Sequence, residues 1–423
     1  AYEISLGLVG SEMRIRDRCS LYDRSYSWGI RIDGCPECRK RGHIGLLSCQ
    51  FSPIERPAPL ENRKSHGMAD FADLLTRGSS AEIIWLGAGN TPLVRSQKIG
   101  PALGIDNLYF KLEGSNPSGS FKDRYVAVSL GIAKNAGYER VVVSSTGNLG
   151  ISVALYSEAY NMPCVILFPE GTPSAMLENA SEHGANLLAT SWDGRQTLFE
   201  YIASKSGWFP VGLFLNRSVQ NPYGVEGYKT FAYELIADLG TAPDLVLFPC
   251  ARGNGLYGAW KGFMESREWG WCSKVPRMLG CQPVGADSLR VSIELSTKYA
   301  VELSPIKSVA FSIMETVAGD QTLEAIRQSN GSAHSASETE ILEAVDQLST
   351  EGISVEASSA LPVACLSSLS QFYQLDKNSI VVCVLTASHR NPKANSSDSI
   401  GFQRIDPLED QLDDYLRNQG LLN

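Results

Sequence analysis

The chain has 423 residues and a hydrophobic fraction of 43%, which is enough for a large core and for two or three domains. A net charge of −9 argues against a nucleic-acid partner, and we expect neither a membrane span nor a signal peptide. Ten cysteines at this length are too dilute for a disulfide scaffold, so we expect a reducing, cytoplasmic setting.

The first 60 residues differ in character from the rest and contain candidate metal ligands. Cys35 and Cys38 form a C-x-x-C pair, with Cys19 before it and Cys49 after it. Two thiolates at this spacing can share one tetrahedral zinc ion. The second half of such a site, which would use Cys19 or Cys49, is irregular. We therefore expect a degenerate ribbon rather than an occupied zinc site.

Residues 55–80 are polar and contain prolines, as expected for a linker, and beyond them apolar runs alternate with helical segments. This alternation is typical of βαβ units around parallel sheets. Beyond Pro407, Leu408, Leu412 and Leu416 share one helical face, which predicts a docked amphipathic helix. We predict strands at residues 108–112, 141–143, 164–168, 187–189, 245–248 and 381–385, and helices at about 120–136, 149–160, 174–183 and 227–239.

Residues 116–124, with the sequence NPSGSFKDR, place a lysine at the start of a predicted helix. Ser120 is its predicted N-cap. Because the N-terminal end of a helix dipole is positive, Lys122 should form a neutral, nucleophilic amine more readily than an ordinary lysine does. A Ser-Phe-Lys sequence in isolation more often marks a surface lysine. The residues alone leave both interpretations open.

The whole stretch resembles the Schiff-base motif of the threonine synthase family, whose members are fold-type-II enzymes that use pyridoxal 5′-phosphate (PLP). The resemblance implies that Lys122 is the catalytic lysine that forms a Schiff base with PLP, and that Phe121 contacts the cofactor. It also implies an α/β fold similar to that of the tryptophan synthase β subunit. In that fold, two doubly wound parallel-sheet domains carry the site, here with a small N-terminal ribbon-like extension.

The domain division that we expect combines this resemblance with the composition. It has an N-terminal module at residues 1–60, a large PLP-binding domain at 61–117 and 213–402, a smaller domain at 118–212 that closes over the substrate, and a C-terminal helix at 403–423. The resemblance alone predicts a homodimer.

A second segment, Ser145-Thr146-Gly147-Asn148, lies where a predicted strand passes into a helix. Free backbone N–H groups at such a turn form an anion site, which suits a substrate carboxylate. The resemblance implies that Ser145, Thr146 and Gly147 bind the substrate and that Asn148 hydrogen-bonds the 3′ oxygen of the PLP ring. Taken alone, the same four residues are an ordinary cap and turn.

A glycine-containing loop follows the predicted strand 245–248, and by resemblance it holds the cofactor phosphate. Small residues let backbone amides approach a phosphate, and the following helix dipole favours the negative charge. Arg252 is unusual in this loop and either adds a charge at a phosphate or points to solvent. The residues assigned to the cofactor here are Arg252, Gly253, Asn254, Gly255 and Leu256.

Two residues near the C-terminal end of the match complete the predicted cofactor site. Thr386 ends a predicted strand, and the family places a threonine or serine there against the pyridine nitrogen. A neutral hydroxyl cannot hold that nitrogen protonated as a carboxylate would, so such rings suit elimination and replacement at the side chain. Glu356 lies in a segment that resembles the family's sequence beside the ring. Four segments match in order over residues 84–392.

The sequence departs from the threonine synthase pattern where the family holds the substrate phosphate. Gly224 stands where threonine synthases usually have an arginine, Tyr228 where they have a glutamine, and Tyr125 where they have a glycine. Loss of the arginine removes a bidentate, charge-assisted contact to phosphate. Arg390 replaces part of the family's continuation after Thr386 and is a candidate substrate-binding residue.

These departures leave three hypotheses. The one we favour resembles the cysteate synthase branch, in which phosphate leaves O-phosphoserine and sulfite or another nucleophile adds at the β-carbon. The alternative is a threonine synthase that converts O-phosphohomoserine to threonine with a pocket rebuilt from Arg217, Arg252 or Arg390. The third is a catalytically silent PLP- or zinc-binding protein. Under the first two, the partner is a small, phosphorylated amino acid.

Overall fold

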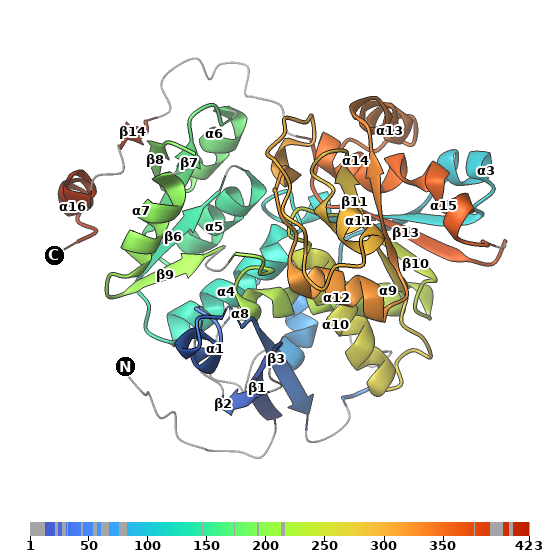
Figure 1. Ribbon diagram of the computed structural model, residues 1–423, viewed down its shortest axis with the longest axis horizontal. Coiled ribbons are helices and arrows are strands. Elements are labelled where there is room, and N and C mark those ends of the chain that lie inside the picture. The colour runs from blue at the N-terminus through green and yellow to red at the C-terminus, as the bar shows by residue number, and fades with distance from the viewer. Residues whose placement is uncertain are drawn as a thin grey trace.

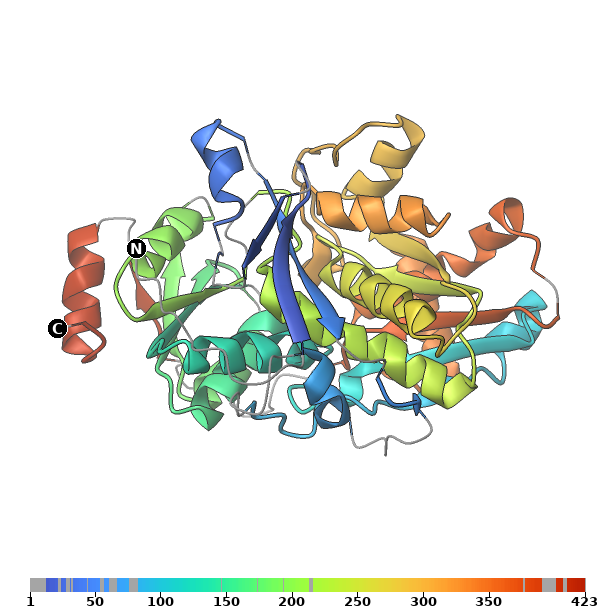
Figure 2. The same ribbon diagram turned by 90° about the horizontal axis from the view of Figure 1, so that it is seen from below.

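The computed structural model describes residues 13–21, 24–27, 31, 33–43, 45–53, 57–60, 67–75, 83–145, 147–172, 174–192, 194–212, 216–375, 377–389, 401–405 and 409–422 (Figure 1). They form two large α/β units side by side and a small antiparallel sheet beneath them (Figures 1 and 2). Within the described part of the chain, no helix is long and apolar enough to cross a membrane.

The larger unit is built on a six-stranded sheet with the order β12-β11-β10-β13-β5-β4. Its strands are parallel except β4, which pairs antiparallel with β5. The strands are β4 (Leu93–Arg95), β5 (Asn107–Leu112), β10 (Leu245–Pro249), β11 (Arg277–Pro283), β12 (Ser332–Ala336) and β13 (Ile380–Leu385).

Both faces of this sheet are buried, and successive side chains of a strand enter opposite cores. In β10, Val246 and Phe248 belong to the core shared with α4, α9, α10 and α12, whereas Leu245 and Leu247 belong to the core shared with α13, α14 and α15. A strand covered on both faces has an apolar residue at almost every position, which is why these runs could be recognised in the sequence.

The smaller unit has a parallel five-stranded sheet with the order β14-β8-β7-β6-β9. Its strands are β6 (Arg140–Ser144), β7 (Cys164–Pro169), β8 (Asn186–Thr190), β9 (Trp208–Val211) and β14 (Gln403–Arg404). The predicted α/β class with two doubly wound sheets is therefore confirmed.

Helices flank both sheets, and several begin or end within two residues of the predicted positions. The helices that pack on the larger sheet or link it to the smaller one are α3 (Ile99–Leu103), α8 (Pro222–Val225), α9 (Lys229–Leu239), α10 (Asn254–Glu268), α11 (Ser288–Glu294), α12 (Asp320–Gln328), α13 (Glu338–Thr350), α14 (Ala357–Ala364) and α15 (Leu366–Phe372). Those of the smaller unit are α4 (Lys122–Asn135), α5 (Asn148–Ala159), α6 (Ser174–Glu182) and α7 (Gly194–Ala203).

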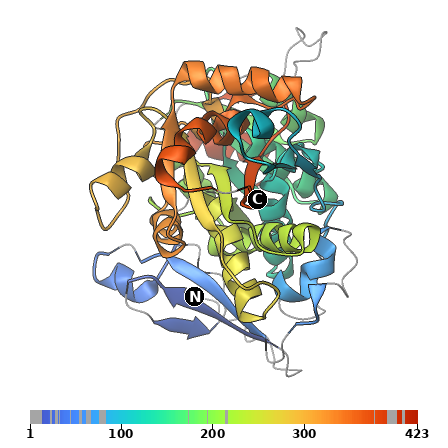
Figure 3. The ribbon, with the colours of Figure 1, turned by 90° about the vertical axis from the view of Figure 1, so that its right-hand side faces the viewer.

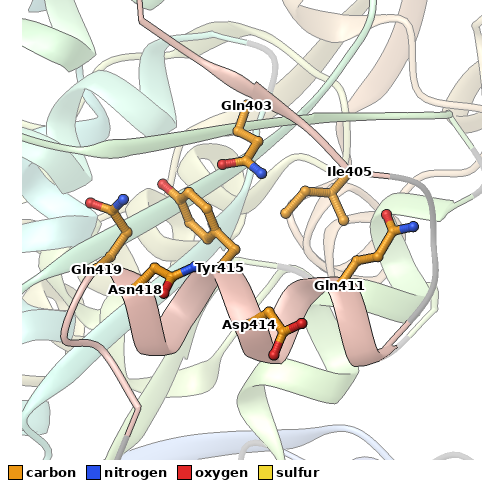
Figure 4. Close-up of a pocket in the computed structure, with 7 residues that line it drawn as sticks. All are labelled: Gln403, Ile405, Gln411, Asp414, Tyr415, Asn418 and Gln419. Atoms are coloured by element: carbon orange, nitrogen blue, oxygen red, sulfur yellow. The ribbon is translucent and has the colours of Figure 1, made fainter.

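The C-terminal segment returns to the smaller unit. It begins with the short strand β14 rather than with a helix, and α16 (Glu409–Asn418) follows. Leu412 and Leu416 are buried against α7, as their spacing predicts, whereas Leu408 lies outside the described residues. A polar hollow of about 380 Å³ separates β14 from α16, with Asp414 and Tyr415 on its wall (Figure 4).

The N-terminal module is a three-stranded antiparallel sheet with one short helix. Its elements are β1 (Met13–Cys19), β2 (Ser25–Ser27), α1 (Pro36–Lys40) and β3 (Leu47–Pro53), with strand order β2-β1-β3. The short helix α2 (Ala72–Leu75) follows it. Figures 2 and 3 show this sheet lying against the body near α8 and α10.

Candidate active site

Lys122 is the first residue of α4, and the loop before it is tied to the end of β13. Phe121 N donates to Thr386 O at 2.9 Å, and Ser388 N donates to Gly119 O at 3.1 Å. Phe121, not Ser120, is the N-cap, although Ser120 Oγ still accepts a 3.4 Å hydrogen bond from Lys122 N. These contacts bring together two predicted site residues, Lys122 and Thr386, that are far apart in the sequence.

The surroundings of Lys122 favour its neutral amine. Burial lowers the pKa of Lys122 to about 8, against the opposing influence of the carboxylates of Glu356 and Glu315. Its Nζ lies 4.5 Å from the centroid of the Phe121 ring. Burial is thus the main cause of the shift that the sequence analysis assigned to the helix dipole.

Thr386 and Glu356 each contact polar side chains from other segments. Thr386 Oγ1 is 3.0 Å from Ser359 Oγ, so its hydroxyl has a neutral partner. Glu356 accepts hydrogen bonds from Asn148 Nδ2 at 3.0 Å and from Ser312 Oγ at 2.8 Å. The Glu356 carboxylate therefore interacts with two other predicted residues. It accepts a hydrogen bond from Asn148, and its charge raises the pKa of Lys122.

The side-chain amide of Asn148 has a buried oxygen that a ligand could satisfy. Its Oδ1 is buried and has no hydrogen-bond partner among the described residues, although buried amide oxygens are nearly always paired. Asn148 is the first residue of α5, and the residue is 7% exposed. A ligand group beside Asn148 would satisfy this amide, and the 3′ oxygen of PLP is such a group.

The glycine loop also has the form that a phosphate requires. Gly253 has φ +81°, and a Cβ there would lie 2.3 Å from the Thr322 side chain. A Cβ on Gly255 would lie 2.5 Å from the Phe121 ring. Asn254 is the first residue of α10, and the first amides of a helix have no carbonyl partner in a preceding turn, which suits a phosphate, although Gly255 N here donates to Asn254 Oδ1 at 2.9 Å. The residues present fit PLP.

Arg252 points neither to open solvent nor to a free anion site. Its Nε and Nη2 lie 3.2 Å from Glu315 Oε2, and its Nη1 donates to Asn216 Oδ1 at 3.2 Å. Because Glu315 also acts on the pKa of Lys122, this ion pair lies at the edge of the site. Sequence reasoning missed Glu315, which has no motif around it.

The predicted substrate-carboxylate turn is only partly described. Ser145 Oγ accepts hydrogen bonds from Gly147 N at 3.2 Å and Gly150 N at 3.0 Å, so it caps α5. Thr146 and Arg390 lie outside the described residues. The role of this turn in binding a substrate stays a prediction.

The three positions that depart from the family pattern are in contact. A Cβ on Gly224 would lie 2.5 Å from the Tyr125 ring and 2.4 Å from Ser129 Oγ. The rings of Tyr125 and Tyr228 stack with centroids 6.1 Å apart, and Phe121 lies 5.1 Å from Tyr228. Burial raises the pKa of both phenols, and the Tyr228 hydroxyl has no hydrogen-bond partner in the described part of the chain.

Behind Lys122, a buried ion network supports the start of α4. Arg124 donates to both carboxylate oxygens of Glu113 at 2.8 Å and to those of Glu234 at 2.6 and 2.7 Å. All three side chains are almost inaccessible. Sequence reasoning missed this role of Arg124, although an arginine two residues after the lysine was a usable signal.

Of the two sets of metal ligands that the sequence left open, the structure brings together the one that contains Cys19. Cys35 and Cys38 meet Cys19, and their sulfurs all lie within 4.8 Å of one another. Cys49 lies apart from that group and donates instead to Asp17 Oδ1 at 3.4 Å.

Comparison with known proteins agrees with these features. Residues 84–387 match the family described as pyridoxal-phosphate dependent enzyme. Threonine synthase of Methanocaldococcus jannaschii is 33% identical over 334 residues, which cover 77% of this chain and 80% of the relative. That of Methanosarcina acetivorans is 32% identical over 378 residues, which cover 87% and 90%.

Solved structures agree on the fold. The processed form of threonine deaminase isoform 2 from Solanum lycopersicum superposes with a TM-score of 0.63 at 20% identity, covering 81% of this chain and 95% of that one. Maize serine racemase superposes with a TM-score of 0.62 at 21% identity, covering 72% and 89%. The chain thus belongs to the fold-type-II pyridoxal-phosphate dependent enzymes, as a member of the threonine synthase family.

Proposed function

We propose that this enzyme removes or replaces a leaving group on the side chain of a phosphorylated amino acid, and that O-phosphohomoserine, converted to threonine, is its first candidate substrate. The observation that carries the proposal is that the loop before Lys122 is hydrogen-bonded to Thr386, because Phe121 N donates to Thr386 O, and that the partner of the Thr386 hydroxyl is the neutral hydroxyl of Ser359. The names of relatives that share about a third of its residues support the threonine reaction.

The chemistry follows from the groups around the cofactor. PLP, when bound, supplies an electron-withdrawing ring that lets a proton leave the α-carbon of an amino acid. Lys122 is the base that would accept this proton at Nζ, because a pKa of about 8 leaves part of the amine neutral near pH 7. Thr386 would hydrogen-bond the ring nitrogen without protonating it, which favours reaction at the side chain.

A second candidate is β-elimination or β-replacement on O-phosphoserine, with sulfite or another nucleophile adding. The packing around Gly224 favours it, because the Tyr125 ring occupies the space that an arginine side chain at this position would need. A shorter substrate places its phosphate elsewhere. The loss of a family phosphate ligand is then expected rather than anomalous.

The predicted closing of residues 118–212 over the substrate has a structural basis in where the site residues come from. Lys122 and Asn148 begin α4 and α5 of the smaller unit. Glu356 and Thr386 belong to the larger unit, at the start of α14 and after β13. A shift of one unit against the other would change the distances among these four side chains, which is how domain closure assembles a site.

Release of inorganic phosphate tests the proposal. The purified holoenzyme is incubated separately with O-phosphohomoserine and O-phosphoserine, and amino-acid products are identified by mass spectrometry. Release from phosphohomoserine with threonine formed supports the first candidate, and release from phosphoserine alone supports the second. Release from neither, in protein that carries PLP, would refute both and leave a silent PLP-binding protein or another activated amino acid.

A further inference from the structure

Three cysteines of the N-terminal module meet in one buried cluster. Cys19 ends β1, Cys35 is the N-cap of α1, and Cys38 lies within that helix. The Sγ atoms of Cys19 and Cys38 are 3.4 Å apart, and all three sulfurs lie within 4.8 Å of one another. Two sulfurs on one tetrahedral zinc ion, each at about 2.3 Å from the metal, are about 3.8 Å apart. The cluster has nearly this size.

The backbone around the cluster is shaped to the sulfur atoms. A Cβ on Gly45 would lie 2.4 Å from Cys38 Sγ, so this position has no room for a side chain. Cys35 N donates to Gly45 O at 2.8 Å, and His43 N donates to Cys38 O at 2.9 Å. These two bonds hold the segment after α1 next to Cys35 and Cys38, and the third cysteine, Cys19, comes from the end of β1.

An oxygen atom lies next to one of the three sulfurs. The Tyr26 hydroxyl lies 3.0 Å from Cys35 Sγ. The other candidate, Cys49, is engaged with Asp17. The arrangement therefore offers three sulfur ligands and one oxygen, rather than the four sulfurs of two C-x-x-C pairs.

We propose that Cys19, Cys35 and Cys38 bind one Zn²⁺ ion as thiolates, with an oxygen, from Tyr26 or a water beside it, in the fourth position. Binding would release the three thiol protons, and no oxidant or reductant is needed. Zinc fits because it combines a preference for thiolates with tetrahedral geometry. The apolar cluster around these cysteines is small, and a module with so little core commonly depends on a metal for its stability.

The N-terminal module also contacts α8, the helix that contains Gly224. Arg31 N donates to the Tyr223 hydroxyl at 2.6 Å, and Lys261 Nζ donates to Cys49 O at 2.6 Å. Tyr223 directly precedes Gly224 in α8. A bound metal would hold β1 and β3 in the shape that makes these contacts, so its primary role would be structural.

The test is the metal content of the full-length holoenzyme, purified without chelators and analysed by plasma mass spectrometry. We expect about one zinc per chain, and less than about a tenth of this in Cys19→Ser and Cys38→Ser. Cys272→Ser and Cys49→Ser are the matched controls and should keep the metal. PLP absorbance, read in every variant, reports whether the body is still folded.

A second measurement uses the wild-type protein first, so its main result does not depend on whether a variant folds. The wild-type protein is stripped of metal under reducing conditions and titrated with Co²⁺, whose thiolate charge-transfer and tetrahedral d–d bands report the ligand set. Tyr26→Phe should retain the thiolate bands and alter the d–d bands. The proposal fails if the wild-type chain binds neither metal, or if peptide mapping without reductant finds a Cys19–Cys38 disulfide in the fresh protein.

Discussion

The side of the active site that contains Lys122 and the side that contains Gly224 differ in how closely they follow the threonine synthase pattern. Lys122, Asn148 and Thr386 occupy positions that suit PLP and are held by hydrogen bonds between distant segments. Tyr125 and Gly224 replace family residues and pack against each other. The contrast indicates that the segments resembling the family's cofactor site and the segment resembling its phosphate site have diverged from the family pattern to different extents.

Removal of Lys122 should have the largest effect on the side of the site that follows the threonine synthase pattern. Lys122→Ala deletes the amine that we propose binds PLP and accepts the α-proton, so we expect phosphate release to fall by about 10³-fold or more. Borohydride reduction followed by peptide mass spectrometry should attach the cofactor to Lys122 in the parent enzyme and nowhere in the variant. Lys134→Ala, at the exposed end of the same helix, is the control and should retain full activity.

Arg124→Met tests whether the side of the site that contains Lys122 depends on the buried ion network of Arg124, Glu113 and Glu234. Loss of Arg124 removes the cation beside Glu113 and leaves Glu234 with Lys111 Nζ at 3.4 Å, which should cost about 3–5 kcal/mol in the free energy of unfolding. Urea denaturation measures this loss. Arg290→Met removes half-exposed ion pairs and should cost only about 0–1 kcal/mol. Equal losses in the two variants would mean that the network does not support the site.

Gly224 and Tyr125, which depart from the family pattern, should depend on each other for stability. Gly224→Ala forces a Cβ to 2.5 Å from the Tyr125 ring and should destabilise the fold by about 1–3 kcal/mol. In a Tyr125→Gly background the cost should be smaller, although the contact with Ser129 Oγ at 2.4 Å remains, and a double-mutant cycle measures the difference. Gly401→Ala, where no atom lies within 4 Å, is the control.

The same pair tests the choice of substrate. Tyr125→Gly combined with Gly224→Arg restores the residues usual in threonine synthases, and should raise phosphate release from O-phosphohomoserine relative to O-phosphoserine. An unchanged ratio, in a variant that still binds PLP, would show that the Tyr125–Gly224 contact does not determine specificity.

Much of the fold was readable from sequence because buried parallel strands are continuously apolar. The exceptions have physical reasons. β12 is the sequence SAHSA, which has little β propensity of its own and forms a strand by pairing with β11. β9 contains Pro210, which argues against a central strand, and the structure places it at the edge of its sheet.

The site was readable only where a short segment carries its own signal. Lys122, Asn148 and Thr386 stand in recognisable motifs, so their meeting could be expected. Ser359, the partner of Thr386, stands in the segment around Glu356 that resembles the family's sequence, whereas Glu315, which raises the pKa of Lys122, has no local pattern and reaches the site through tertiary packing. The contact between Tyr125 and Gly224 joins residues that are 99 positions apart, so two apparently separate departures proved to be one change in packing.

The smallest expected effect is a pH dependence that separates Lys122 from an ordinary lysine. Its pKa is lowered to about 8 by burial, so the neutral amine forms as pH rises through about 8. The rate at which the apoenzyme recombines with PLP should therefore increase up to this pH and level off above it, as followed by absorbance. Glu356→Gln removes a charge that raises the pKa, and should move the midpoint lower; Glu315→Gln should move it less. A midpoint near 10.4, the ordinary value for lysine, would contradict a buried amine.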